Sequence, residues 1–261
     1  MKLFDTHCHL DDRAYKNDMD AVVSRAHAAG VLAMMTVGTD KQSSQKAVAM
    51  AETIPGLFAS VGTHPHDAKD IGKTDLDFMR NLAKSPKVKA WGEIGLDFNR
   101  MYSPREIQED WFVDQLSVAD ELGLPIIFHE RDSDGRLIEL LKKHPSSERK
   151  GVIHCFSGNE NELQQYLEMG FYIGITGILT LKDRGAGLRE LSCMIPQDRL
   201  VVETDAPYLT PAPEKNHTRR NEPAFVRSVM FKLSQVRGND PEALASIVWE
   251  NSCSLYRIPH F

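Results

Sequence analysis

The feature that most constrains the fold is the regular alternation of short apolar runs with longer amphipathic stretches along the whole chain. Eight runs rich in Val, Ile and Phe and bounded by Gly or Pro are predicted to be β-strands. They cover residues 2–9, 31–38, 57–64, 88–97, 125–130, 151–158, 171–177 and 200–207. Because strands that alternate with helices form parallel βαβ units, this pattern predicts an α/β protein.

The stretch "SPREIQEDWFVDQLSVADELG" is the clearest helical pattern between these runs. Ser103 and Glu106 have the spacing of a capping box, Pro104 suits the first helical position, and Gly123 suits the end of the helix. Two further helices are predicted near the C-terminus, in "NEPAFVRSVMFKLSQVRG" and in "DPEALASIVWENSCSLY". Asp240 is expected to cap the second of these.

Eight such units close most economically into a single (β/α)8 TIM barrel, and the 261 residues fit the usual length of about 250. A doubly wound open sheet is the alternative, but neither a G-x-G-x-x-G motif nor a phosphate loop follows any predicted strand. Because the chain contains no repeats and no long linkers, we expect one domain over residues 1–261.

The overall composition limits which binding partners and which cellular compartment we expect for this protein. A formal net charge of −6 argues against broad electrostatic adhesion to nucleic acid or to anionic membranes, although metals and a few Arg could still hold such a substrate locally. Four Cys without a C-x-x-C pair indicate reduced thiols. Neither a signal peptide nor a membrane-length apolar run is recognisable. We therefore expect a cytoplasmic monomer with no membrane association and no obligate protein partner.

Polar side chains gather at the ends of the predicted strands, which is where the active site of a barrel forms. They are His7, His9, His64, His66, Glu93, His129, His154, Glu203 and Asp205. His, Glu and Asp that converge from different strands suit divalent transition metals, and a metal pair needs a bridging ligand. We assign one ion to His7, His9, Glu93 and Asp205. The second ion is assigned to Glu93, His129 and His154.

The motifs that carry these residues are "THCH", "GEIGLDF", "FHERD", "HCFSG" and "ETDAPYL", in that order. Together with "GTHPHD" and "RRNEP" they resemble the TatD-type metal-dependent deoxyribonucleases of the amidohydrolase superfamily, over residues 3 to about 258. The resemblance implies phosphodiester hydrolysis that removes nucleotides from a DNA 3′ end. It also implies that His64 contacts a substrate phosphate.

Two carboxylates are predicted to act in the chemistry. Glu93 would bridge the two ions. Asp205 would accept a proton from a water whose pKa the metal lowers. Glu203 lies deeper on the same strand face as Asp205, and either orients a ligand from behind or has a direct role.

Each of the following arginines has two possible roles. Arg131 binds a phosphate oxygen, or it pairs with Asp97 or Asp132. Arg219 and Arg220, in the long loop after the last predicted strand, bind phosphate or form a solvated pair with a structural role. His66 is expected to be a surface loop residue.

Three functions remain open from the sequence. The first is a 3′–5′ exonuclease that acts on single-stranded DNA, with RNA as a further substrate, and uses two divalent ions. Mg²⁺ or Mn²⁺ would support activity, while the nitrogen ligands also suit Zn²⁺. The second is a metal-dependent hydrolase of an amide, lactone or ester bond in a small molecule. The third is a non-catalytic, metal-binding quality-control protein. Related amide hydrolases often bridge their metals with a modified Lys, so Glu93 favours the first function.

Overall fold

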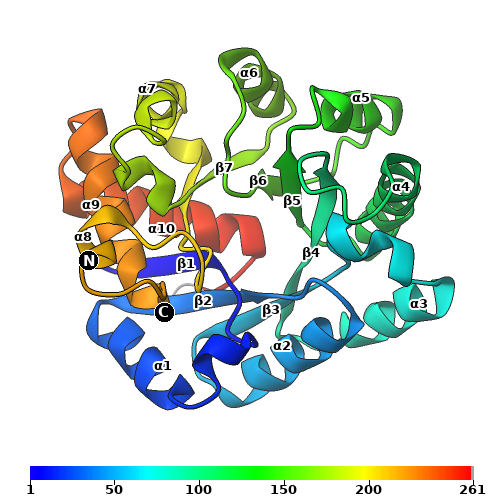
Figure 1. The fold of residues 1–261 in the computed structure, drawn as a ribbon, viewed down its shortest axis with the longest axis horizontal. Helices are drawn as coiled ribbons and strands as arrows, with labels where there is room; N and C mark the ends of the chain where they lie inside the picture. Colours follow the sequence, from blue (N-terminus) through cyan, green and yellow to red (C-terminus); the bar gives the residue numbers. More distant parts are fainter. Residues whose placement is uncertain (260–261) are drawn as a thin grey trace. The chain divides into compact units, whose positions relative to one another are not determined.

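The computed structural model describes residues 1–259, and its eight strands follow one another in the order β1 to β8 in one parallel sheet. Helices alternate with these strands along the chain (Figure 1). The predicted (β/α)8 barrel class is therefore confirmed. The chain divides into two compact units, unit 1 with Met1–Thr36 and Tyr172–Phe261, and unit 2 with Val37–Phe171. The expectation of one domain over residues 1–261 stays a prediction.

Unit 1 holds both ends of the described chain. Its strands are β1 (Leu3–Cys8), β2 (Val31–Val37, whose last residue begins unit 2), β7 (Tyr172–Ile175) and β8 (Leu200–Val202). Its α-helices are α1 (Met19–Ala28), α7 (Ala186–Met194), α8 (Ala212–Lys215), α9 (Val226–Arg237) and α10 (Pro241–Tyr256). Its 3-10 turns are η1 (Arg13–Tyr15), η3 (Gly177–Thr180), η4 (Gln197–Arg199) and η5 (Pro223–Phe225).

Parallel pairing within unit 1 joins β1 to β2 and β7 to β8. A bridge between Cys8 and Ala206 brings the segment after β8 beside the end of β1. Phe4, on β1, packs against α10. Its ring centroid lies 5.7 Å from that of Tyr256 and 6.3 Å from that of Trp249. Burial of these aromatic rings contributes much of the hydrophobic free energy of this core.

Unit 2 contains the middle of the chain. Its strands are β3 (Leu57–Val61), β4 (Val88–Asp97), β5 (Ile126–Arg131) and β6 (Gly151–Ile153). Its helices are α2 (Lys41–Thr53), α3 (Lys73–Leu82), α4 (Arg105–Leu122), α5 (Arg136–Lys143) and α6 (Glu160–Glu168), with the 3-10 turn η2 (Pro65–Asp70) after β3. Strand β4 pairs with β3 and with β5, and β5 pairs with β6.

The register between β4 and β5 positions the polar residues of unit 2. Ile94 pairs with Phe128, Gly95 with His129, and Asp97 with Arg131. Gly95 adopts φ +149°, and a Cβ there would overlap the carbonyl oxygen of His129. Only glycine therefore allows β4 to approach β5 this closely at the level of His129.

Two predicted helix ends are confirmed and one is wrong. Gly123 closes α4 in the left-handed conformation, and the Asp240 side chain caps α10 by accepting from the N–H of Ala243. The predicted capping box of Ser103 and Glu106 is not formed, because α4 begins after Pro104. The Ser103 hydroxyl instead donates to the carbonyl of His66 and accepts from the N–H of Lys69.

The last strands are shorter than predicted. Strand β6 ends at Ile153 and β8 at Val202, so His154 and Asp205 follow their strands and do not lie within them. Cys155 (φ 47°) and Asp205 (φ 58°) adopt the left-handed conformation, which ends an extended strand. Among residues 1–259, no helix is both long enough and apolar enough to span a membrane.

Candidate metal centre

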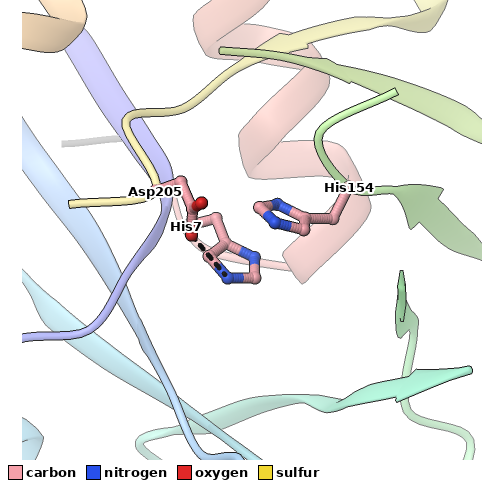
Figure 2. A group of neighbouring side chains, drawn as sticks. All are labelled: His7, His154 and Asp205. Carbon is pink, nitrogen blue, oxygen red and sulfur yellow. Dashed lines mark ion pairs between the residues drawn. The ribbon is translucent and has the colours of Figure 1, made fainter. Parts of the chain in front are cut away.

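Three of the predicted ligands gather in unit 1. His7 near the end of β1, His9 just after it and Asp205 after β8 bring three donor atoms together. The Nε2 atoms of His7 and His9 are 3.2 Å apart. Oδ1 of Asp205 lies 3.3 Å from Nε2 of His9 and 3.8 Å from that of His7, and Figure 2 shows the latter pair as a dashed line. The alternation of β1 predicted the His pair.

The backbone holds this cluster in place. The N–H of Asp205 donates to the carbonyl of His7, and the N–H of His9 donates to the carbonyl of Ala206. Asp205 is a non-glycine residue with positive φ, a costly conformation that tends to persist at functional sites. The two segments are thus tied to each other at the level of the donor atoms.

Unit 1 contains two further buried carboxylates, Asp5 and Glu203. Asp5 accepts from the N–H and the hydroxyl of Thr204, and burial raises its pKa well above the usual value. Glu203 is buried, accepts a 3.4 Å hydrogen bond from Thr6, and occupies space that a Cβ on Gly174 would fill. A glycine on β7 therefore makes room for a carboxylate on the segment after β8.

Glu93, His129 and His154 lie together in unit 2. Oε1 of Glu93 is 2.6 Å from Nδ1 of His129 and 3.9 Å from Nε2 of His154. Figure 2 also draws His154, which follows β6. Burial lowers the pKa of His129, but hydrogen bonds to Asp97 and Glu93 outweigh burial and raise that pKa to about 9. Without a metal this imidazole is therefore a cation at neutral pH.

The donor atom of His64 lies within 4.8 Å of those of Glu93 and His129. Its Nδ1 accepts the backbone N–H of His66 at 3.1 Å, so the neutral ring carries its proton on Nε2. That Nε2 faces Nδ1 of His129 at 3.1 Å. In this tautomer Nε2 of His64 can donate a hydrogen bond, and the donor atoms of His64, Glu93 and His129 also lie close enough together to hold an ion.

Asp97 is a member of the site that the sequence reasoning missed. It is buried, and its Oδ2 lies 2.7 Å from Nε2 of His66 and 3.3 Å from Nε2 of His129. Burial raises its pKa, but the hydrogen bonds from the two imidazoles hold the pKa far below its ordinary value. The signal in the sequence was its position four residues after Glu93, on the same strand face.

The prediction that His66 is a surface residue is wrong. Its ring packs edge-on against His64, with 4.2 Å between centroids, and against Tyr102, with 4.7 Å. With Asp97 behind it, His66 is part of the polar cluster. The side chain of Tyr102 remains exposed at the edge of this group.

The arginines that were considered as phosphate ligands differ in their ion pairs and in their exposure. Within residues 1–259 the Arg131 guanidinium pairs with neither Asp97 nor Asp132, so the predicted ion pair is not formed. Arg220 is bound to Asp18 and Glu222 at 2.7 and 2.8 Å. Arg219, next to it, is exposed to solvent. Arg220 is thus structural, while Arg219 is exposed and Arg131 is partly exposed.

The donor sets fit divalent transition metals. For a tetrahedral ion with bonds of about 2.0–2.2 Å, neighbouring donor atoms lie roughly 3.3–3.6 Å apart. The distances of 3.2, 3.3 and 3.8 Å in unit 1 are close to that spacing. In unit 2 the distances of 2.6 and 3.9 Å lie on either side of it. Imidazole nitrogen with carboxylate oxygen is also the ligand chemistry that such ions prefer.

A (β/α)8 fold with His, Glu and Asp donors at or just after the ends of its strands is typical of metal-dependent hydrolases. The family described as TatD related DNase matches residues 4–257 of this chain. The chain belongs to this family, within the amidohydrolase superfamily, as the motifs predicted.

Individual relatives are similar to this chain over nearly its full length. The chain is 40% identical to the 3′-5′ ssDNA/RNA exonuclease TatD of Salmonella typhimurium, over 98% of this chain and 99% of the relative. It is 37% identical to the metal-dependent hydrolase YabD of Bacillus subtilis, over 98% and 99%. The crystal structure of YjjV, a TatD homologue from Escherichia coli, superposes with a TM-score of 0.91 at 29% identity, covering 98% of both chains.

Proposed function

We propose that this protein is a divalent-metal-dependent 3′–5′ exonuclease that acts on single-stranded DNA, with RNA as a further substrate. The observation that carries the proposal is the 40% identity, over nearly the full length, to a relative named as a 3′-5′ ssDNA/RNA exonuclease. The buried histidine and carboxylate donors of both units support it, because phosphodiester hydrolysis at neutral pH commonly uses such metal sites.

Two ions are proposed, with Glu93 as the ligand they share. His7, His9 and Asp205 would hold the first together with Glu93, and the second would be held by Glu93, His129 and His154. The spacing of the donor atoms in unit 1 supports the first set. The fold class supports both sets, since the active sites of barrels form at the carboxyl ends of the strands. Mg²⁺ or Mn²⁺ would serve activity, and Zn²⁺ also suits the nitrogen ligands.

The bound ion and the residues of the chain would have different roles in the hydrolysis. A bound divalent ion supplies Lewis acidity that lowers the pKa of water and offsets negative charge on a phosphoryl group. Asp205 accepts the proton of the attacking water as general base. The bond from phosphorus to the 3′ oxygen breaks, which releases a 5′-mononucleotide and leaves a 3′ hydroxyl on the shortened strand.

The remaining residues hold the substrate and the ligands. The Nε2–H of His64 donates to a phosphate oxygen, consistent with its tautomer. Arg131 and Arg219 bind phosphate through guanidinium groups that pair with no carboxylate within residues 1–259. Glu203 orients the end of β1 from behind through Thr6. Local contacts of this kind suit a protein whose net charge is −6.

A time course on a 5′-labelled single-stranded DNA oligomer with Mg²⁺ or Mn²⁺ tests this proposal. We expect a ladder that shortens from the 3′ end one nucleotide at a time, and an intact oligomer with Asp205→Asn. Asp198→Asn is the matched control, since that carboxylate is 71% exposed at the surface. An oligomer left intact by the metal-loaded wild-type protein would refute the nuclease function. Small amide, lactone and ester substrates would then be tested, and inactivity on these would leave the non-catalytic metal-binding function.

A further inference from the structure

The loop after β4 carries an exposed aromatic side chain beside the polar cluster of unit 2. Tyr102 is 55% exposed. Its ring packs edge-on against that of His66, with 4.7 Å between centroids, and the ring of His66 lies 6.1 Å from that of His129. The ring of Tyr102 therefore lies at most about 11 Å from an imidazole that is proposed to bind a metal ion. A large part of its surface is free to contact a bound substrate.

Hydrogen bonds hold the loop on both sides of Tyr102. At the start of the loop, Oδ1 of Asp97 accepts the backbone N–H of Arg100 at 2.7 Å. At its end, the carbonyl of the buried Ser103 accepts from Nε2 of Gln108 at 2.8 Å. Because the backbone is already fixed, little further conformational entropy is lost when the ring of Tyr102 contacts a ligand.

Two positively charged residues flank Tyr102 in the sequence. Arg100 and Arg105 are both exposed. The guanidinium of Arg105 lies over the ring of Phe98, 4.4 Å from its centroid, and so stays at this loop. Sites for single-stranded nucleic acid typically combine cations, which follow the phosphate backbone, with aromatic rings on which bases stack. Residues 98–105 offer both kinds of group.

We propose that Tyr102 is a substrate-binding residue that stacks on an unpaired base near the 3′ end of a single strand. The inference rests on the proposed function. Every base has an aromatic face, so this contact favours single strands without selecting a sequence. Stacking also needs no net positive charge, which suits a protein with a net charge of −6. The competing explanation is that Tyr102 only packs against His66.

Steady-state cleavage of two matched oligomers separates these explanations. One is an intact single-stranded DNA, and the other has abasic sites in place of its last three nucleotides. We expect Tyr102→Ala to lower kcat/KM on the intact oligomer by about 5–140-fold, which corresponds to roughly 1–3 kcal/mol for one stacked base. The loss should fall mainly on KM, and Tyr102→Phe, which keeps the ring, should stay within about twofold of the wild type.

The abasic oligomer tests whether the lost contact is with a base. The wild type should cleave it less efficiently than the intact oligomer. On this substrate Tyr102→Ala and the wild type should agree within about twofold, because no base remains near the 3′ end to stack on the ring. A purely structural role would instead lower the activity of Tyr102→Ala on both oligomers by the same factor.

Two controls show whether the substitution disturbs the site itself. Zn²⁺ affinity of metal-free Tyr102→Ala should stay within about twofold of the wild type, because Tyr102 supplies no ligand atom. Phe231→Ala removes a ring that is 42% exposed on α9 in unit 1, where the guanidinium of Arg227 lies 5.1 Å from its centroid. It should leave kcat/KM on both oligomers within about twofold of the wild type.

The proposal is overturned if Tyr102→Ala cleaves the intact oligomer as well as the wild type does, or if it loses the same factor on both oligomers. Fluorescence anisotropy with a labelled phosphorothioate oligomer, which resists hydrolysis, measures binding to the metal-loaded proteins without cleavage. Tyr102→Ala should weaken this binding by about 5–140-fold. Binding through Tyr102 by a wild-type protein that leaves DNA intact would refute the exonuclease function alone. A wild-type protein that binds no single-stranded DNA would refute both.

Discussion

Gly95→Ala should destabilise the protein through one identifiable steric overlap. The added Cβ would overlap the carbonyl oxygen of His129 and lie 2.8 Å from its carbonyl carbon, where ordinary contacts are 3.4–4 Å. Its φ of +149° adds roughly 1–3 kcal/mol for any residue with a Cβ. Forcing β4 and β5 apart adds about 1–3 kcal/mol more, the usual cost of overpacking a filled interior.

Gly123→Ala is the control that isolates the overlap. Gly123 also has a positive φ, of +62°, but a Cβ added there would meet no atom within 4 Å. This variant should therefore lose only the backbone contribution, roughly 1–2 kcal/mol. The overlap by itself, about 1–3 kcal/mol, corresponds to a melting temperature lower by roughly 2–12 °C than that of the control, before any difference between the two backbone contributions is added.

Differential scanning calorimetry of the metal-free proteins measures this difference, and a Zn²⁺ titration shows whether His129 is displaced as well. Equal melting temperatures for Gly95→Ala and Gly123→Ala would refute the reasoning. The close approach of β4 to β5 would then have no effect on the free energy of unfolding. Lower stability with unchanged Zn²⁺ affinity would show that the displacement does not reach the imidazole.

Three other predictions concern charge and metal binding. Arg220→Ala should lower the free energy of unfolding by about 1 kcal/mol, because Asp18 and Glu222 lose one of their two arginine partners and keep only Arg25. Arg219→Ala should change it by less than about 0.5 kcal/mol and raise KM for DNA, and urea unfolding and steady-state kinetics measure both effects. Metal affinity should rise with pH up to about 9, because the ion must displace the proton of His129. That proton is lost only as the pH approaches the raised pKa of His129. A Zn²⁺ affinity that does not change between pH 6.5 and 8.5 would contradict this prediction. Chelation should abolish cleavage and lower the melting temperature, and Mn²⁺ at about 100 times its Kd should restore activity together with about 2.7 kcal/mol of stability for each ion bound.

The positions of the metal-competent residues could be predicted because they follow from strand periodicity and barrel topology. "FDTHCHL" places His7 and His9 on one side of the chain, and each later motif begins within a predicted strand. The long strand β4 matched its predicted bounds of 88–97, since it is buried along nearly its whole length and paired on both sides.

The supporting contacts could not be predicted in the same way. The role of Asp97 depends on the register between β4 and β5, which brings the end of one strand beside His129 on the other. His66 resembled a loop residue because it follows Pro65, but the 3-10 turn η2 directs its ring inward. The early ends of β6 and β8 depend on positive φ at Cys155 and Asp205, and no periodicity reveals such a local backbone choice.

Anomalous diffraction from crystals soaked in Mn²⁺ tests the central claim, a pair of metal ions held by six named side chains, most directly. The account predicts two manganese peaks, one against His7, His9 and Asp205 and the other against Glu93, His129 and His154. The second peak should be lost in His154→Ala, while the first is retained. A single peak, or manganese bound away from these side chains, would contradict the account.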